Sequence, residues 1–302
     1  MGDLRFSGHD SFQCRNLWLK KGYDFVMKSK ESKSPFNNNL AVIDLGVGKN
    51  MVSSIRFWMK AFDMLDDENE LPTNLASYLL DKDGKDPFLE DLGTLWLLHY
   101  KLVSKSEASI YNLVFNKFRK HRIEFKKTHL INFLISECER LDENHSPNSI
   151  ETDVGVFLKN YVAPDPKEGK NNIEDHYASL LIELNLIKKI ENYVGDKFEL
   201  DKDWYKIESS ERESLPIEIF LYVILDNEEI LGSSISFQKL LNAENSPGNI
   251  FVMTPDALVS KIHELTKKFN GIVYTEDAGV RELQITGEFN KESILDQYYG
   301  RN

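Results

Sequence analysis

The sequence predicts a mainly α-helical fold, with an N-terminal helical domain that contains a helix-turn-helix, followed by winged-helix-like α+β units. Three observations predict it. Residues 39–65 show two helical apolar patterns separated by a glycine. Much of the chain from 93 to 162 keeps the helical period, and two alternating stretches, around 194–196 and 277–279, follow helices as hairpins would. We divide the chain into 1–145 (the helical domain with basic and acidic patches), 146–214 (a helix plus hairpin) and 215–302 (a C-terminal winged-helix-like unit).

The composition limits the classes of function. The chain has 302 residues and a net charge of −12, which argues against a protein that coats nucleic acid without selectivity. No apolar run is long enough to span a membrane, and the first residues have no signal-peptide core. The two cysteines form no metal or redox motif. We therefore expect a cytoplasmic protein that does not contact membranes.

The first residues are basic and aromatic, with His9 next to Asp10. Adjacent side chains in a regular element point in different directions, so this pair is not expected to chelate a metal. A cap or a buried hydrogen bond is the favoured role.

Residues 39–65 predict a helix-turn-helix whose turn is at Gly46. Short polar and basic side chains at the start of the second helix are of the kinds that contact phosphates and base edges in the major groove. The candidates for DNA contact are Lys49, Asn50, Ser53, Ser54 and Arg56. Any two packed helices joined by a glycine would give the same pattern, so this alternative stays open. A phosphate-binding loop is excluded, because Ile43 and Asn50 occupy positions where it needs glycine and a hydroxyl.

Residues 81–91 are rich in acids and precede the next predicted helix. Oxygen ligands on such a loop suit Mg²⁺ or Mn²⁺, with Asp83, Asp86 and Glu90 as candidate ligands and Asp86, Glu90 and Asp91 as candidate catalytic acids. The alternative is structural: an Asp-Gly turn followed by acids that favour the positive end of a helix dipole.

Residues 93–103 predict a helix with a broad apolar face, on which His99 is expected to be a hydrogen-bonded core histidine. The strongest basic run follows, interleaved with phenylalanines at 115, 118 and 125. Its candidates for phosphate contact are Arg119, Lys120, Arg122 and Lys126. A solvated helix face is the alternative.

Two helix-plus-hairpin patterns complete the chain. The first predicts a helix from 173 that carries Tyr177, Leu180, Leu181 and Leu184, followed by strands around 194–196. The second predicts helices at 216–225 and 254–269, with Thr254 as N-cap and Pro255 at the first helical position. A turn at SPGN and two strands around 277–279 complete the unit. No elbow, zinc, dinucleotide or kinase signature occurs.

Several stretches, in order along nearly the whole chain, resemble one bacterial family. They are FSGHDSFQCRNLWLKKGYDF, LGVGKNMVSSIRFWMKAF, DGKDPFLEDLGTLWLLHYKLV, ETDVGVFLKNY, IELNLI, SPGNIFVMTPDAL and EDAGVRELQI. The family is SspB-like, formerly a domain of unknown function, and is encoded in DNA phosphorothioation (Ssp) modification-defence clusters. The resemblance implies contact with double-stranded DNA and partnership with ATP-dependent sulfur-transfer and desulfurase components. It also places the residue 81–91 acids in a family motif.

Two hypotheses follow. The favoured one is a DNA-binding component of such a system that acts as a metal-dependent nicking endonuclease. The other is a non-catalytic DNA-binding adaptor or transcription regulator that recruits sulfur-transfer enzymes. The arrangement of the 81–91 acids discriminates between them, because a nuclease needs these acids to converge on one cavity beside a basic groove.

Overall fold

The chain folds as a mainly helical α+β protein with two small antiparallel sheets, as the sequence predicts. The structure is a computed structural model that describes residues 4–29, 35–38, 40–164, 179–194 and 199–300. These residues form two compact units, the first from Met1–Val114 and Phe118–Ile207, the second from Phe115–Lys117 and Glu208–Asn302. The three-part division of the sequence stays a prediction. None of the described helices is both long enough and apolar enough to cross a membrane.

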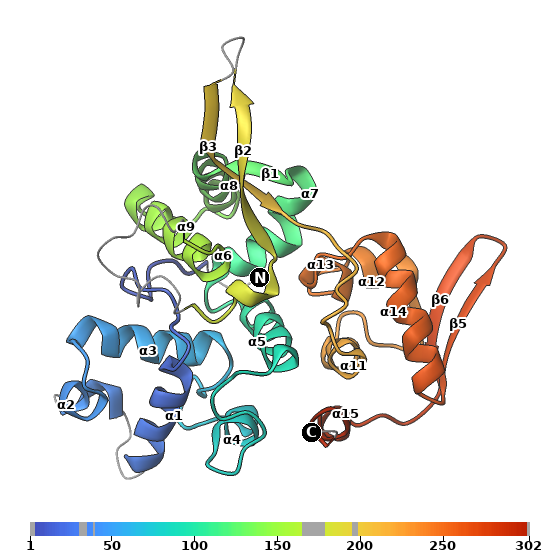
Figure 1. Ribbon diagram of the computed structural model, residues 1–302, viewed down its shortest axis with the longest axis horizontal. Helices are drawn as coiled ribbons and strands as arrows, with labels where there is room; N and C mark the ends of the chain where they lie inside the picture. The colour runs from blue at the N-terminus through green and yellow to red at the C-terminus, as the bar shows by residue number, and fades with distance from the viewer. Residues whose placement is uncertain (1–3, 30–34, 39, 165–178, 195–198, 301–302) are drawn as a thin grey trace. The chain divides into compact units, whose positions relative to one another are not determined.

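The first unit is built mainly from helices (Figure 1). Its N-terminal part contains α1 (Trp18–Lys28), η1 (Pro35–Asn37), α2 (Ala41–Leu45), α3 (Lys49–Ala61), α4 (Asn74–Leu80) and α5 (Leu92–Lys105). The chain continues through α6 (Ser109–Leu113), the π-helical turn η2 (Val114–Phe118), α7 (Arg119–His121), α8 (Lys127–Arg140), α9 (Pro147–Tyr161) and η3 (Ile182–Leu184). The sheet contains β1 (Glu124–Lys126), β2 (Ile187–Val194) and β3 (Glu199–Ile207) in the order β1-β3-β2.

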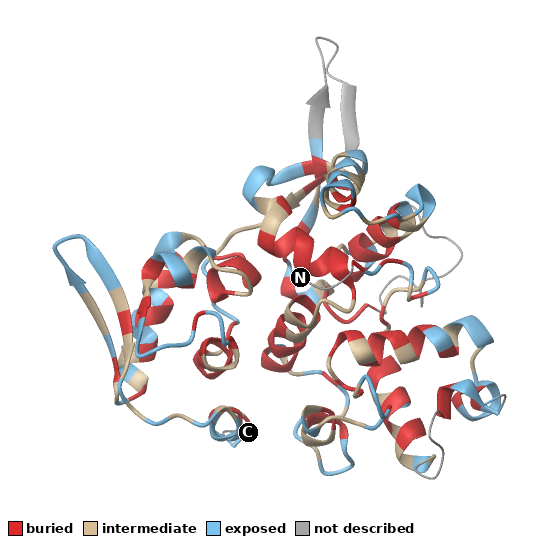
Figure 2. Ribbon diagram, turned by 180° about the vertical axis from the view of Figure 1, so that it is seen from behind, coloured by how far each residue is buried: buried red, intermediate tan, exposed pale blue. Residues whose placement is uncertain are grey.

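Helix α5 lies in the core of the first unit, since ten of its residues are buried. Figure 2 shows this burial along its length. His99 is fully buried there, and its Nδ1 lies 2.8 Å from the hydroxyl of Tyr161 in α9. The predicted role of His99 as a hydrogen-bonded core residue is therefore confirmed.

The two helices at 41–61 turn where the sequence predicts. Gly46 ends α2 in the left-handed conformation with φ 60°, which favours glycine. The apolar residues Ala41, Leu45, Val52 and Ile55 are buried between the helices and the rest of the unit. The structure therefore has two packed helices joined at a glycine, as the sequence predicts.

The prediction of a helix from 173 is wrong for those of its residues that the structure describes. Residues 180–184 form a turn and the single 3₁₀ turn η3, which ends at Asn185 in the left-handed conformation. Leu180, Leu181 and Leu184 are nevertheless buried, because a 3₁₀ turn places them on the core as well as a helix would. Tyr177 lies outside the described residues, as does the turn predicted at 195–196.

The second unit repeats the order of elements of the first: a helix, a short strand, further helices and a hairpin. It contains α11 (Ile217–Asp226), β4 (Ser234–Ser236), α12 (Phe237–Asn242), α13 (Pro247–Ile250), α14 (Pro255–Lys268), β5 (Ile272–Asp277), β6 (Val280–Ile285) and α15 (Lys291–Tyr299). The sheet order is β4-β6-β5, so the short strand again pairs with the last strand. In Figure 1 the β5–β6 hairpin lies along α14.

Local signals explain the ends of these elements. Ala278 and Gly279 link β5 to β6 with φ 48° and 82°, the backbone of a tight hairpin turn. The SPGN turn is instead the short helix α13, because the side chain of Ser246 accepts a hydrogen bond from the N–H of Asn249 and caps it. Thr254 caps α14 as predicted.

We expect Thr254→Ala to lower the free energy of unfolding by about 1 kcal/mol. The hydroxyl of Thr254 accepts the N–H of Ala257 at 3.1 Å, and alanine would leave that donor without its cap. The control is Thr266→Ala inside the same helix, where alanine has the higher helix propensity and no cap is lost. Urea denaturation of both variants measures the difference. Equal losses would show that the cap does not stabilise α14.

Candidate nucleic-acid interface

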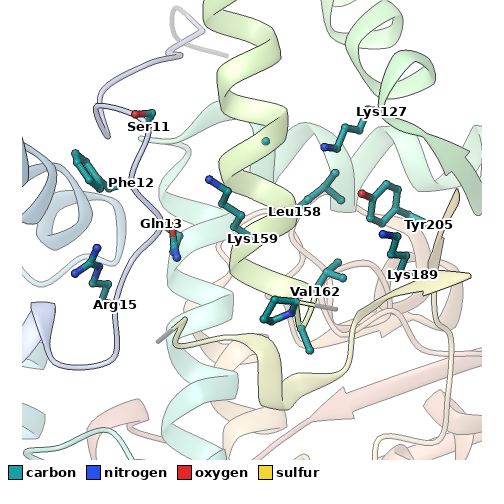
Figure 3. A pocket seen from close by; sticks show the side chains of 13 residues that line it. Ser11, Phe12, Gln13, Arg15, Lys127, Leu158, Lys159, Val162, Lys189 and Tyr205 are labelled. Carbon is teal, nitrogen blue, oxygen red and sulfur yellow. The ribbon is translucent and has the colours of Figure 1, made fainter. Parts of the chain in front are cut away.

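A basic groove lies on the first unit (Figure 3). Its volume is about 420 Å³. Its walls come from segments far apart in the sequence, namely the residues before α1, the start of α8, the end of α9, and β2 and β3. The lining residues are Ser11, Phe12, Gln13, Arg15, Lys127, Gly155, Leu158, Lys159, Val162, Ala163, Pro164, Lys189 and Tyr205.

Helix α9 runs between the two walls of the basic groove. Leu158 and Lys159 follow Gly155 by three and four residues, and Val162 follows Gly155 by seven, so these four residues share one face at the end of the helix. In Figure 3 the residue 11–15 segment lies on one side of α9, and Lys127, Lys189 and Tyr205 lie on the other. The groove therefore requires the first unit to be folded.

The basic groove is strongly cationic. Arg15, Lys127, Lys159 and Lys189 line it, and among the described residues no aspartate or glutamate does. Lys127 and Lys159 are exposed, and neither forms an ion pair with a described residue. Lys127 is also the first residue of α8, where the helix dipole adds to the positive potential. This concentration of charge on a chain of net charge −12 indicates an anionic ligand.

One wall of the groove is held by polar side chains of α9. The carboxylate of the buried Asp153 accepts a hydrogen bond from the N–H of Ser7 at 2.7 Å and lies 3.1 Å from Nε2 of His9. Two turns later, the side-chain oxygen of Asn160 accepts the N–H of Cys14 at 3.1 Å. His9 is 1% exposed, so its predicted structural role is confirmed.

Helix α3 holds the same wall from its other side. The indole of Trp58 donates a hydrogen bond to the carbonyl of Phe12 at 3.0 Å and stacks on the His9 ring. A side chain at Gly8 would overlap the ring of Phe57, so only glycine allows this approach.

The backbone of this wall is strained. Ser7, Asp10 and Ser11 have φ values of 70°, 44° and 64°, in a region that residues other than glycine rarely adopt. Each such residue costs of order 1 kcal/mol and persists only where surrounding contacts impose it. Strain of this kind clusters at functional sites, and here it occurs where the chain enters the basic groove.

The predicted residues of α3 have different environments. Lys49, Asn50 and Ser53 are exposed along its first turns, as contact with DNA would require. Ser54 is fully buried, so its predicted exposure is wrong, because the helical period turns it to the core. Arg56 forms an ion pair with the buried Glu70, which gives it a structural partner.

Only part of the basic run after η2 is exposed to solvent. Lys120 and Arg122 are exposed and Lys126 is half-buried. Arg119 is also half-buried, and burial lowers the pKa of its guanidinium to about 10. The interleaved phenylalanines at 115, 118 and 125 are buried in the core and cannot stack on bases.

The residue 81–91 acids do not converge on a cavity. Asp86 is buried, and its two carboxylate oxygens accept the N–H groups of Glu90 and Asp91, each at 3.0 Å. Asp91 caps α5 by accepting the N–H of Thr94, also at 3.0 Å. Asp83 and Glu90 are exposed, so the structural alternative describes this turn.

No group of three or more His, Cys, Asp and Glu side chains that could hold a metal ion occurs in the part of the chain that the structure describes. Both oxygens of Asp86 are already occupied by backbone donors. Asp83, Asp86 and Glu90 therefore do not form such a group in this structure. The metal-binding and catalytic roles of these acids stay predictions.

Sequence patterns do not identify most residues of the basic groove as functional. Lys159 and Lys189 each stand in an ordinary amphipathic pattern, and Lys127 belongs to the basic run but is not among its candidates for phosphate contact. Two features of the sequence do point to the basic groove. One is the FSGHDSF segment, which forms the strained wall, and the other is Gly155, a glycine in the interior of a helix.

Comparisons with known proteins agree over nearly the whole chain. Residues 6–299 match a family described as "Protein of unknown function (DUF4007)". A magnesium ion-bound SspB crystal structure is similar with a TM-score of 0.81 and 30% identity, covering 98% of this chain and 88% of that one. A second SspB crystal structure has a TM-score of 0.82 and 29% identity, with the same coverage. Among curated proteins, no relative matches the chain.

We expect Arg56→Ala to lower the free energy of unfolding by about 1–3 kcal/mol, because it leaves the buried carboxylate of Glu70 with only Lys60, 3.5 Å away. The double variant with Glu70→Gln is expected to recover part of the loss, since the uncompensated charge is gone. Lys49→Ala, also on α3 but exposed, is the control and is expected to change stability by less than about 0.5 kcal/mol. An Arg56→Ala protein of unchanged stability but weakened DNA binding would instead make Arg56 a DNA contact.

Proposed function

The chain belongs to the DUF4007 family and is SspB-like, and from this premise we propose that it is the DNA-binding component of a DNA phosphorothioation system. The basic groove carries the proposal. Four cationic side chains line it, no carboxylate of the described part of the chain does, and phosphate is the anion that DNA presents. The similarity to SspB supports the link to phosphorothioation and to other components of such a system.

The order of elements supports a winged-helix-like interpretation of both units. In each, a short strand precedes a group of helices and a hairpin, and the short strand pairs with the last strand of the sheet. In helix-turn-helix proteins the second helix of the pair faces DNA. In the first unit the corresponding helix is α9, which lines the basic groove.

Helix α3 offers a second candidate surface for double-stranded DNA. Lys49, Asn50 and Ser53 are exposed on its first two turns, where they could contact the backbone and base edges. Among the residues of the basic run, Lys120 and Arg122 are exposed as well. These surfaces are predicted to add to the binding that the groove provides.

We expect Lys127→Ala with Lys159→Ala to weaken binding to all DNA sequences alike. Each lysine that neutralises a phosphate contributes roughly 0.7–0.9 to the magnitude of the slope of log K against log salt, so removing two should lower that magnitude by about 1.4–1.8. Fluorescence anisotropy of a labelled oligonucleotide at several salt concentrations measures it.

The matched control for this charge change is Lys82→Ala with Lys239→Ala, because both lysines are exposed and neither lines the groove. This variant removes the same charge and is expected to keep the wild-type slope. Equal slopes for the two double variants would remove the groove from the binding surface.

A second candidate function is metal-dependent nicking, which is favoured by one observation: a similar solved structure is a magnesium-bound SspB. We expect the protein to convert supercoiled plasmid to open circles with Mg²⁺ or Mn²⁺. Asp83→Ala with Glu90→Ala tests the acids without touching the structural carboxylate of Asp86, because both residues are exposed. Loss of nicking by this variant would place the site at 81–91, whereas nicking that survives would place it elsewhere.

A wild-type protein that binds DNA but never nicks it would favour the adaptor or transcription regulator that recruits sulfur-transfer enzymes. In that case the Asp83 and Glu90 double variant should bind DNA as the wild type does. Plasmid nicking and anisotropy on the same protein preparation separate these cases.

A further inference from the structure

The basic groove has an apolar side that contact with phosphates does not require. Beside its cations, it is lined by Phe12, Leu158, Val162, Pro164 and the buried ring of Tyr205. Proteins that bind only the phosphate backbone need charge and hydrogen-bond donors. A positive groove with apolar and aromatic lining is instead typical of proteins that hold unpaired nucleotides.

Packing does not explain why residue 155 of α9 is a glycine. Glycine in a helix interior costs stability relative to alanine. A Cβ at Gly155 would meet no atom of the described residues within 4 Å, and its backbone does not adopt the left-handed conformation. No close contact and no backbone conformation therefore requires glycine here. Its effect is to leave the helix surface bare where it lines the groove, so that a flat ring can approach the backbone.

The size of the groove agrees with a single nucleotide. A volume of about 420 Å³ lies within the range of sites for small ligands. A duplex keeps its bases stacked in its interior, so only its backbone could approach such a groove. A base that has left the stack can enter it.

We infer that the basic groove holds one unpaired nucleotide, with its phosphates on Lys127, Lys159 and the neighbouring cations and its base over Gly155. This inference rests on the proposed function, because it assigns the form of DNA that the same groove takes. It predicts that filling the space above Gly155 weakens the binding of single strands and spares duplexes, whose backbone needs only the exposed Lys127 and Lys159 of the groove and the exposed residues of α3.

Gly155→Leu tests the inference, with Gly155→Ala and Asn148→Leu as controls. Alanine fits the same position without filling the groove. Asn148→Leu introduces the same side chain at an exposed position of α9 that does not line the groove. Leucine and alanine both favour helix more than glycine does, so all variants are expected to fold, and thermal melting checks this.

Binding of a labelled single-stranded 15-mer and of the corresponding duplex is measured by anisotropy for each protein. Gly155→Leu is expected to weaken single-strand binding about tenfold, the loss of roughly one stacked base, and duplex binding less than twofold. Both controls are expected to stay within twofold of the wild type on both ligands. Equal weakening on strand and duplex, or none on the strand, would overturn the inference.

Binding by the wild-type protein distinguishes a failure of this inference from a failure of the proposed function. A wild type that binds duplex but not single strands overturns the inference alone, whereas one that binds neither overturns both. Competition with thymidine monophosphate identifies the source of the nucleotide. Displacement of the strand supports a site for free nucleotides, and Gly155-dependent strand binding that resists displacement supports a nucleotide held within a strand.

Discussion

Residues 7–15 are held between α3 and α9, and the basic groove on the surface of the first unit depends on this constraint. Asp153 and Asn160 of α9 accept its backbone N–H groups, and Trp58 of α3 donates to its carbonyl at Phe12. The three side chains that form these bonds are buried, so leaving the polar group of one of them unpaired would cost about 1–3 kcal/mol. Together they hold a segment with unfavourable backbone angles in one conformation, and that segment is a wall of the basic groove.

The groove shows how an acidic protein can present a site for an anion. Its cations come from four separate segments of the chain, and only Lys127 belongs to the strongest basic run of the sequence. Exposed charges of one sign repel one another only weakly in water, which allows lysines to gather without a large cost in stability. The absence of carboxylates among the lining residues then determines the sign of the local potential.

Several residues that the sequence predicts to be functional have partners within the fold. Asp86 and Asp91 satisfy backbone donors before α5, and Arg56 compensates the buried charge of Glu70. The same chemistry explains both interpretations, because a carboxylate that can bind a metal can equally accept two N–H groups. Only the orientation of the neighbouring backbone decides between them, and orientation is not encoded in residue type.

The sequence by itself determined the features that depend on neighbours along the chain: the mainly helical class, the turn at Gly46, the cap at Thr254 and the hairpin at 277–279. These follow from local periodicity and backbone preferences, which act over a few residues. Tertiary structure alone decided the groove, because Arg15, Lys127, Lys159 and Lys189 are separated by up to 174 positions and meet only when α9 packs beside residues 7–15 and the sheet. It also decided which charges stay exposed, since burial depends on what each helix packs against.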